Sequence, residues 1–136
     1  MTPPRPTADI PVHKKVWGTE LWIANRSFCG KKLVVRAGYR CSIHWHEQKD
    51  ETFYLAAGRI VMEVDGVPHL MKPGDKLDMP PGVKHRFTAL EESELLEFST
   101  HHEEADSYRD SKSEVVPPTE FAALVKRFGH GAPEVH

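Results

Sequence analysis

The chain has little cysteine, no long apolar run and no strong excess of charge of either sign. It contains 136 residues with only two cysteines, Cys29 and Cys41. So few thiols do not indicate a disulfide-rich secreted domain, and we expect reduced cysteines in a cytoplasmic protein, although a bond between the two stays open. No apolar stretch approaches the roughly 20 residues that a membrane-spanning helix needs.

The balanced charge, the lack of a signal sequence and the lack of repeats limit the kinds of partner and organisation that we expect. With 18 basic and 20 acidic residues, the net charge is −2, which predicts neither a nucleic acid nor an anionic membrane as a partner. Residues 1–11 contain four prolines and no apolar core, so we expect no secretory signal here. There is no internal repeat, and this length is typical of one domain with a core of its own.

Three histidines and a glutamate stand in a frame of glycines and a proline. The frame reads Gly38-x5-His44-x-His46-x4-Glu51-x6-Gly58, followed by Gly74-x5-Pro80-x-Gly82-x2-His85. On a strand, His44 and His46 point to the same side. Glu51 has the opposite parity, so a turn at residues 48–50 must precede it. His85 comes from another strand, so the four side chains meet only if the sheet curls back.

This set of side chains indicates a metal site. A lone His-x-His motif is more often a surface or structural feature, but the complete frame favours ligands. Three imidazoles and one carboxylate suit a divalent transition metal such as Mn, Fe, Co, Ni or Zn.

Short segments separated by turn residues predict a β-rich fold. Asp65-Gly66 is a strong two-residue hairpin signal. Because no helices alternate with the strands, the pattern predicts an all-β barrel or jelly roll. We expect strands at residues 16–24, 31–36, 40–46, 52–57, 59–64, 67–71, 76–79, 83–89 and 93–100.

The C-terminal segment has a different pattern. Phe121, Leu124, Val125 and Phe128 have helical spacing, with Thr119 suited to the N-cap and Gly129 to the C-terminal end. We therefore expect an N-terminal arm at residues 1–14, a barrel at residues 15–116, and a helix and tail at residues 117–136. The helix should pack on the barrel or on a partner subunit, and we expect a homodimer.

The two motif blocks resemble the two conserved motifs of the cupin superfamily. The resemblance covers residues 38–85, includes His44, His46, Glu51 and His85, and departs at Ala89, where many cupins have asparagine. It implies a cupin jelly-roll β-barrel, followed here by one C-terminal helix.

A narrower resemblance concerns Val16-Trp17-Gly18, residues 38–46 and residues 79–86. These are similar to the cupin-type mannose-6-phosphate isomerases and to lyxose isomerases. Residues 106–110 resemble that group's Asp-x-x-Arg-x-x-Asp segment with altered spacing, but the Tyr-Gly-Arg that follows in the group is replaced by Ser-Lys-Ser. The resemblance implies metal-dependent conversion of an aldose, or an aldose phosphate, to a ketose. An Fe(II)-dependent dioxygenase acting on a small organic substrate and a non-catalytic cupin that binds a metal and a sugar remain alternatives.

Further residues are candidates for catalysis and substrate binding. Glu97 is the one carboxylate inside an apolar strand and is our candidate for the catalytic base, the alternative being an exposed strand residue. Arg40 and Ser42 share the parity of His44 and are expected to line the cavity. On the polar loop, His101 and Arg109 are candidate anion binders or, alternatively, solvated surface groups.

Cys41 lies three residues before His44 and therefore has the opposite parity. We expect its side chain to point away from the metal and to serve packing.

Overall fold

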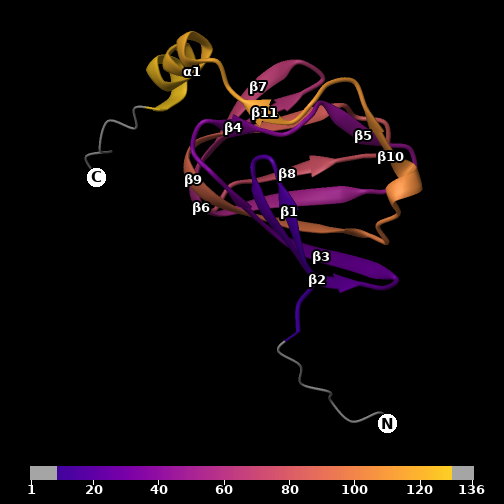
Figure 1. Ribbon diagram of the computed structural model, residues 1–136. Helices are drawn as coiled ribbons and strands as arrows, with labels where there is room; N and C mark the ends of the chain where they lie inside the picture. Colours follow the sequence, from indigo (N-terminus) through magenta and orange to yellow (C-terminus); the bar gives the residue numbers. More distant parts are fainter. Residues whose placement is uncertain (1–8, 130–136) are drawn as a thin grey trace.

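The computed structural model describes residues 9–129, which form one curled, antiparallel sheet of eleven strands with a short helix at one end (Figure 1). This arrangement is the all-β jelly roll that the sequence predicts. The strands are β1 (Val12–Lys15), β2 (Gly18–Asn25), β3 (Phe28–Val35), β4 (Tyr39–Arg40), β5 (His44–His46), β6 (Glu51–Val64), β7 (Val67–Met71), β8 (Lys76–Met79), β9 (His85–Thr100), β10 (Ser107–Arg109) and β11 (Glu114–Val115).

The two longest strands, β6 and β9, pair along their whole length and carry most of the barrel. The prediction of two shorter strands in place of each was wrong. Gly58, taken as a strand end, has a φ of 93° and lies so close to β9 that a Cβ there would be 2.2 Å from the Ser93 Oγ. The register shifts around Gly58, so the bulge bends both strands without ending them.

The predicted hairpin between β6 and β7 is confirmed. Val64 pairs with Val67, and Asp65 and Gly66 have positive φ angles of 48° and 81°. Two positive φ angles in a two-residue loop are the geometry that matches the twist of the flanking strands.

The N-terminal part of the sheet extends further than the sequence indicates. Strand β1 pairs with β2 from Val12↔Leu21 to Lys15↔Gly18. Residues 12–14, assigned to the arm by the sequence, therefore belong to the sheet. Residues 9–11 of the expected arm are exposed and form no strand, and its residues 1–8 and the tail at residues 130–136 lie outside the described residues.

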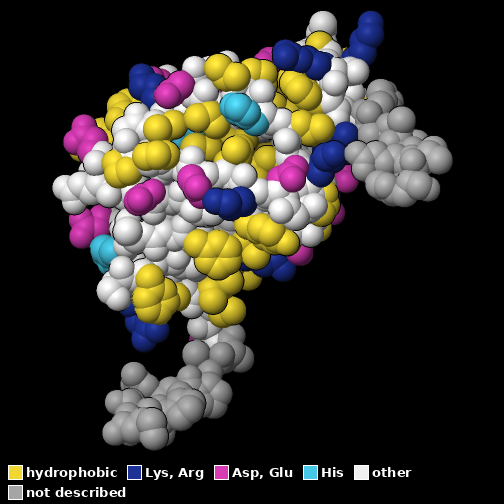
Figure 2. Space-filling view, turned by 180° about the vertical axis from the view of Figure 1, so that it is seen from behind, with side chains coloured by type: hydrophobic (Ala, Val, Ile, Leu, Met, Phe, Trp, Pro, Cys, Tyr) yellow, Lys and Arg dark blue, Asp and Glu magenta, His cyan; other side chains and the backbone are white. Residues whose placement is uncertain are grey.

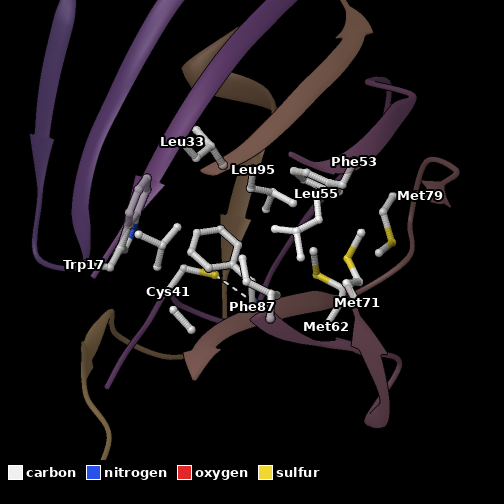
Figure 3. Close-up of a cluster of buried hydrophobic side chains, with 13 residues drawn as sticks. Trp17, Leu33, Cys41, Phe53, Leu55, Met62, Met71, Met79, Phe87 and Leu95 are labelled. Atoms are coloured by element: carbon white, nitrogen blue, oxygen red, sulfur yellow. Dashed lines mark hydrogen bonds between the residues drawn. The ribbon is translucent and has the colours of Figure 1, made fainter. Parts of the chain in front are cut away.

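The core fills the inside of the curled sheet (Figure 3). The ring of Trp17 meets that of Phe87 edge to face at a centroid distance of 5.1 Å, and the Cys41 Sγ accepts the Phe87 N–H at 3.3 Å. Each fully buried side chain of this kind contributes about 1.5–3 kcal/mol. Cys29 and Cys41 are both free and buried, so the disulfide left open above is not formed. The cluster comprises Trp17, Leu33, Val35, Cys41, Phe53, Leu55, Ile60, Met62, Met71, Met79, Phe87, Ala89 and Leu95.

The C-terminal helix α1 spans Pro118–Leu124 and continues as a π-helical turn, Val125–Gly129. It begins at Pro118, not after a Thr119 cap as predicted, because proline lacks the N–H that the first helical position would leave unpaired. None of its residues is buried. Polar contacts tie it to the barrel: Arg59 donates to the Phe128 carbonyl at 2.7 Å, and Glu120 accepts from Arg40.

Candidate metal centre and its surroundings

The fold brings His44, His46 and His85 together inside the barrel. His44 and His46 come from β5, and His85 begins β9 directly opposite His44 in the sheet register. One nitrogen from each ring lies within 4.8 Å of the others, which is close enough for a single metal ion. The short strand β5 and the first residue of the long strand β9 thus present three imidazole nitrogens near one point.

The orientation of the three imidazoles leaves their Nε2 atoms available. Each Nδ1 lies by a backbone carbonyl: Ser42 O at 2.8 Å for His44, Asp106 O at 3.0 Å for His46 and Val83 O at 3.1 Å for His85. A carbonyl only accepts, so each Nδ1 carries the hydrogen and each Nε2 presents a lone pair. This is the tautomer that holds histidine ligands in metalloproteins.

Glu51, the first residue of β6, completes the cluster. Its Oε1 lies 3.5 Å from the His46 Nε2, and its Oε2 lies 3.3 Å from the His85 Nε2. Among residues 9–129, Glu51 Oε2 and His85 Nε2 are the buried side-chain atoms without a hydrogen-bond partner. Two buried lone pairs facing each other are costly unless a cation lies between them. The donor set therefore fits a divalent transition metal.

The protonation states agree with metal binding. Burial lowers the pKa of His44 to about 3 and also lowers that of His46. Burial by itself would raise the pKa of Glu51, but the contacts with His85 and Lys49 outweigh it, and the pKa lies below its ordinary value. At neutral pH His44 and His46 are neutral and Glu51 is ionised, which are the forms that ligate metals.

Lys49 is a buried cation beside the cluster. The sequence indicated only a polar turn at this position. Its Nζ lies 3.1 Å from the Glu51 Oε1, 2.7 Å from the Glu97 Oε2 and 2.8 Å from the His102 Nδ1. All three ammonium hydrogens are thus used. Residues 47–50 form no strand, so strand periodicity gave no signal for the direction of this side chain.

Glu97 faces the cavity from β9 and is only 5% exposed. The alternative of an exposed strand residue is therefore wrong. Burial and the nearby Glu51 charge raise the pKa of Glu97, while Lys49 partly offsets this. A carboxylate with a raised pKa is a stronger base than an ordinary one.

His102, for which the sequence offered no role, extends this network to the surface. It accepts the hydrogen bond from Lys49, and its Nε2 donates to the Glu104 Oε1 at 2.8 Å. Burial lowers its pKa to about 4, so the ring is neutral and able to accept from Lys49. Because His102 follows the end of β9, no strand periodicity indicated its direction.

Asp106 holds the loop between the ligands. Its carboxylate accepts the backbone N–H groups of Glu47, Gln48 and Lys49 at 3.0–3.2 Å, and its own carbonyl accepts from the His46 Nδ1. One residue thus fixes the orientation of His46 and the turn that brings Lys49 and Glu51 to the site.

A cavity of about 360 Å³ opens beside the cluster. It is large enough for a small organic molecule. Of the predicted substrate-binding residues, Ser42 and Arg109 line it. It is also lined by Lys14, Lys15, Glu20, Lys31, Leu33, His44, His46, Lys49, Glu51, Phe87, Glu97 and His102.

Two predicted positions differ from the observed ones. Arg40 points its guanidinium at Glu114 and Glu120 instead of the cavity. Cys41, expected to point away, lines the cavity with its Sγ 4.0 Å from the His44 Nδ1. Both expectations assumed a continuous strand, whereas residues 41–43 form an irregular segment in which strand parity does not apply. The packing role predicted for Cys41 is confirmed by its place in the core.

His101 lies on the surface, where its Nδ1 donates to the Arg26 carbonyl at 2.7 Å. It lies at a separate shallow pocket with Thr100 and Glu103, outside the lining of the cavity described here. Within residues 9–129, no helix is long and apolar enough to cross a membrane.

The fold and the histidine cluster define a cupin. The family model described as a cupin domain matches residues 32–100, half of the chain, and the chain belongs to this family, as its motifs predicted. The Streptomyces PAC13 structure with uridine superposes with a TM-score of 0.71 at 14% identity, covering 88% of this chain and 98% of that chain. This likeness concerns the fold alone.

The curated relatives have different activities, so they do not assign one reaction to this chain. The protein SchB of Streptomyces halstedii is 43% identical over 54 residues, which are 40% of this chain and only 39% of SchB. The D-lyxose ketol-isomerase of Cohnella laeviribosi is 28% identical over 129 residues, covering 74% of this chain and 71% of that enzyme. Quercetin 2,3-dioxygenase of Bacillus subtilis is 34% identical over 68 residues, covering 47% and 20%.

Proposed function

We propose that the protein is a metal-dependent aldose–ketose isomerase acting on a sugar or a sugar phosphate. The observation that carries this proposal is the buried ion pair between Lys49 and Glu97, directly beside the histidine cluster. A site that only binds a ligand has no need for a buried acid–base pair, and such pairs cluster at catalytic positions.

His44, His46, Glu51 and His85 would hold the metal. When bound, it supplies Lewis-acid polarisation of a carbonyl and a template for two adjacent oxygens. This chemistry suits the carbonyl at C1 and the hydroxyl at C2 of an aldose.

Glu97 and Lys49 have different roles, and the hydroxyl proton of O2 passes to O1 as the carbon-bound proton moves from C2 to C1. Glu97 is the base that removes the proton from C2 and returns it to C1, and its raised pKa suits both directions of this transfer. Lys49 stays protonated because its carboxylate partners raise its pKa although burial lowers it. Its positive charge then stabilises the negative charge that develops on the substrate oxygens.

The similarity to a lyxose isomerase over most of the chain supports this assignment, and the match to a dioxygenase is shorter. The test is conversion of D-lyxose, D-mannose or mannose 6-phosphate to the ketose by metal-replete protein without oxygen. Glu97→Gln should lower kcat by roughly 10²–10⁴-fold and leave the bound metal, measured by mass spectrometry, unchanged.

A matched control is Glu94→Gln, on the same strand but facing outward, where Glu94 pairs with Lys32. It should retain wild-type turnover. Oxygen consumption by the iron-loaded protein without ketose formation would instead establish a dioxygenase. Sugar-dependent thermal stabilisation without turnover would establish a binding cupin.

A further inference from the structure

A second buried ion pair lies on the cavity wall, separate from the metal cluster. Lys31, on β3, is 3% exposed, and its Nζ contacts the Glu20 Oε1 of β2 at 2.8 Å. Both residues line the cavity. Neither belongs to the candidate ligands or to the proposed acid–base pair.

The partners of this pair leave hydrogen-bonding capacity unused. The Lys31 ammonium lies over the ring of Trp22 at 4.4 Å, and the Trp22 indole N–H donates to the same Glu20 Oε1 at 2.8 Å. Within residues 9–129, one oxygen of Glu20 thus receives both donors, and the ammonium makes one of the three hydrogen bonds it can form. The cavity side of the pair retains both a donor and an acceptor.

Stability alone does not account for a charged pair here. A buried ion pair is on average no more stabilising than apolar side chains of similar volume. The same cavity wall also carries apolar side chains, among them Trp17, Leu33 and Phe87. A ligand with hydroxyl groups, each of which donates and accepts, would use the free capacity of both charges.

The register places the pair at a useful distance from the proposed chemistry. Lys31 is the cross-strand partner of Glu97, and neighbouring strands lie about 4.8 Å apart. This separation is about the span from the reacting carbons of an aldose to the hydroxyls at its other end. We propose that Lys31 and Glu20 bind the distal hydroxyl groups of the sugar and so select substrates by chain length. This rests on the isomerase function proposed above.

The test compares substrates that differ only in the distal part. L-Glyceraldehyde retains the carbonyl at C1 and the hydroxyl at C2 in the configuration of D-mannose, whereas D-mannose adds the distal hydroxyls. The double variant Lys31→Met/Glu20→Leu removes both charges together and leaves no buried charge unpaired. We expect kcat/KM for D-mannose to fall roughly ten- to a hundredfold, mainly through KM, and kcat/KM for L-glyceraldehyde to stay unchanged.

The matched control is Lys32→Met/Glu94→Leu, an ion pair at 3.0 Å between β3 and β9 that faces solvent. It should behave as wild type towards both aldoses. Equal losses on the two aldoses in a folded double variant, or no loss on D-mannose, would overturn the proposal.

A binding measurement separates this proposal from the isomerase assignment. In one outcome, the metal-loaded wild type converts neither aldose and is still thermally stabilised by D-mannose, whereas the double variant is not stabilised. That result would support the sugar subsite and overturn only the isomerase proposal. If D-mannose stabilises neither protein and neither aldose is converted, the subsite is overturned as well.

Discussion

His44 and His46 are neutral because burial disfavours the imidazolium form. His102 illustrates the energetic consequence, since it is not a candidate ligand and its folded-state pKa of about 4 lies below the ordinary value of 6.5. Between these two pH values the unfolded chain binds more protons than the folded protein. Folding is therefore opposed by protonation, and stability falls as the pH decreases through this window.

We expect metal-free protein to lose stability between pH 6.5 and pH 4, with roughly 2 kcal/mol arising from His102. His102→Gln, whose side-chain oxygen still accepts from Lys49, should flatten this part of the profile. Urea unfolding at a series of pH values in a chelator measures it. His101→Gln, which changes the exposed neighbour, should retain the wild-type profile, and equal flattening in both variants would contradict this account.

At the same scale, the sequence predicted well where strand periodicity applied. His44, His46, Glu51 and His85 meet in the fold because their parity and the turn before Glu51 determine where they point. Arg40 was misplaced because an irregular segment follows it. His102 was missed because its direction depends on a contact with Lys49 that is 53 residues distant in sequence.

Among the elements, the loop between β5 and β6 depends on a segment far along the chain. Residues 47–50 form no strand of their own, and three of their N–H groups bind the carboxylate of Asp106. Strand β5 pairs with β9 at one residue pair only, but with β10 at three. The segment around β10 therefore builds the metal centre, although it contributes none of its candidate ligands.

Asp106→Ala should accordingly weaken metal binding, by roughly 10–100-fold, as loss of groups that orient ligands does. Asp106→Asn retains one acceptor oxygen and should lose less. Metal affinity, measured by competition with a chromogenic chelator, checks both variants. Asp110→Asn is the control, because Asp110 forms only an exposed pair with Lys84 nearby. Unchanged affinity in a folded Asp106→Ala protein would show that the loop is held by other contacts.

The elements also show where sequence patterns mislead. The turn signals at residues 65–66 and 73–75 mark real strand ends, but Gly58 does not, since its positive φ serves a bulge inside β6. Composition alone cannot distinguish these cases, because both require a residue without a Cβ. The difference lies in the long-range pairing of β6 with β9.

For the whole molecule, the outside of the curled sheet carries exposed hydrophobic side chains, and Figure 2 shows such side chains grouped on one face. Phe28, Phe98 and Tyr54 are 48%, 55% and 39% exposed. The register places Phe98 opposite Gly30 and Thr52, so that Phe28 and Tyr54 each lie diagonal to Phe98, on opposite sides of it. Adjacent exposed aromatics are typical of a surface that another chain covers.

We therefore expect a homodimer in which this outer surface is buried. Light scattering coupled to size-exclusion chromatography should give the mass of two chains, and Phe98→Lys should give that of one, since a charge at the centre of an apolar interface is costly to desolvate. Val67→Lys, at an equally exposed position on the β6–β7 hairpin, should remain a dimer. Because the metal centre lies inside the barrel, the Phe98→Lys monomer should bind metal as wild type does. A wild-type monomer at micromolar concentration would contradict the dimer. A dimeric Phe98→Lys protein would show that the interface is on another surface.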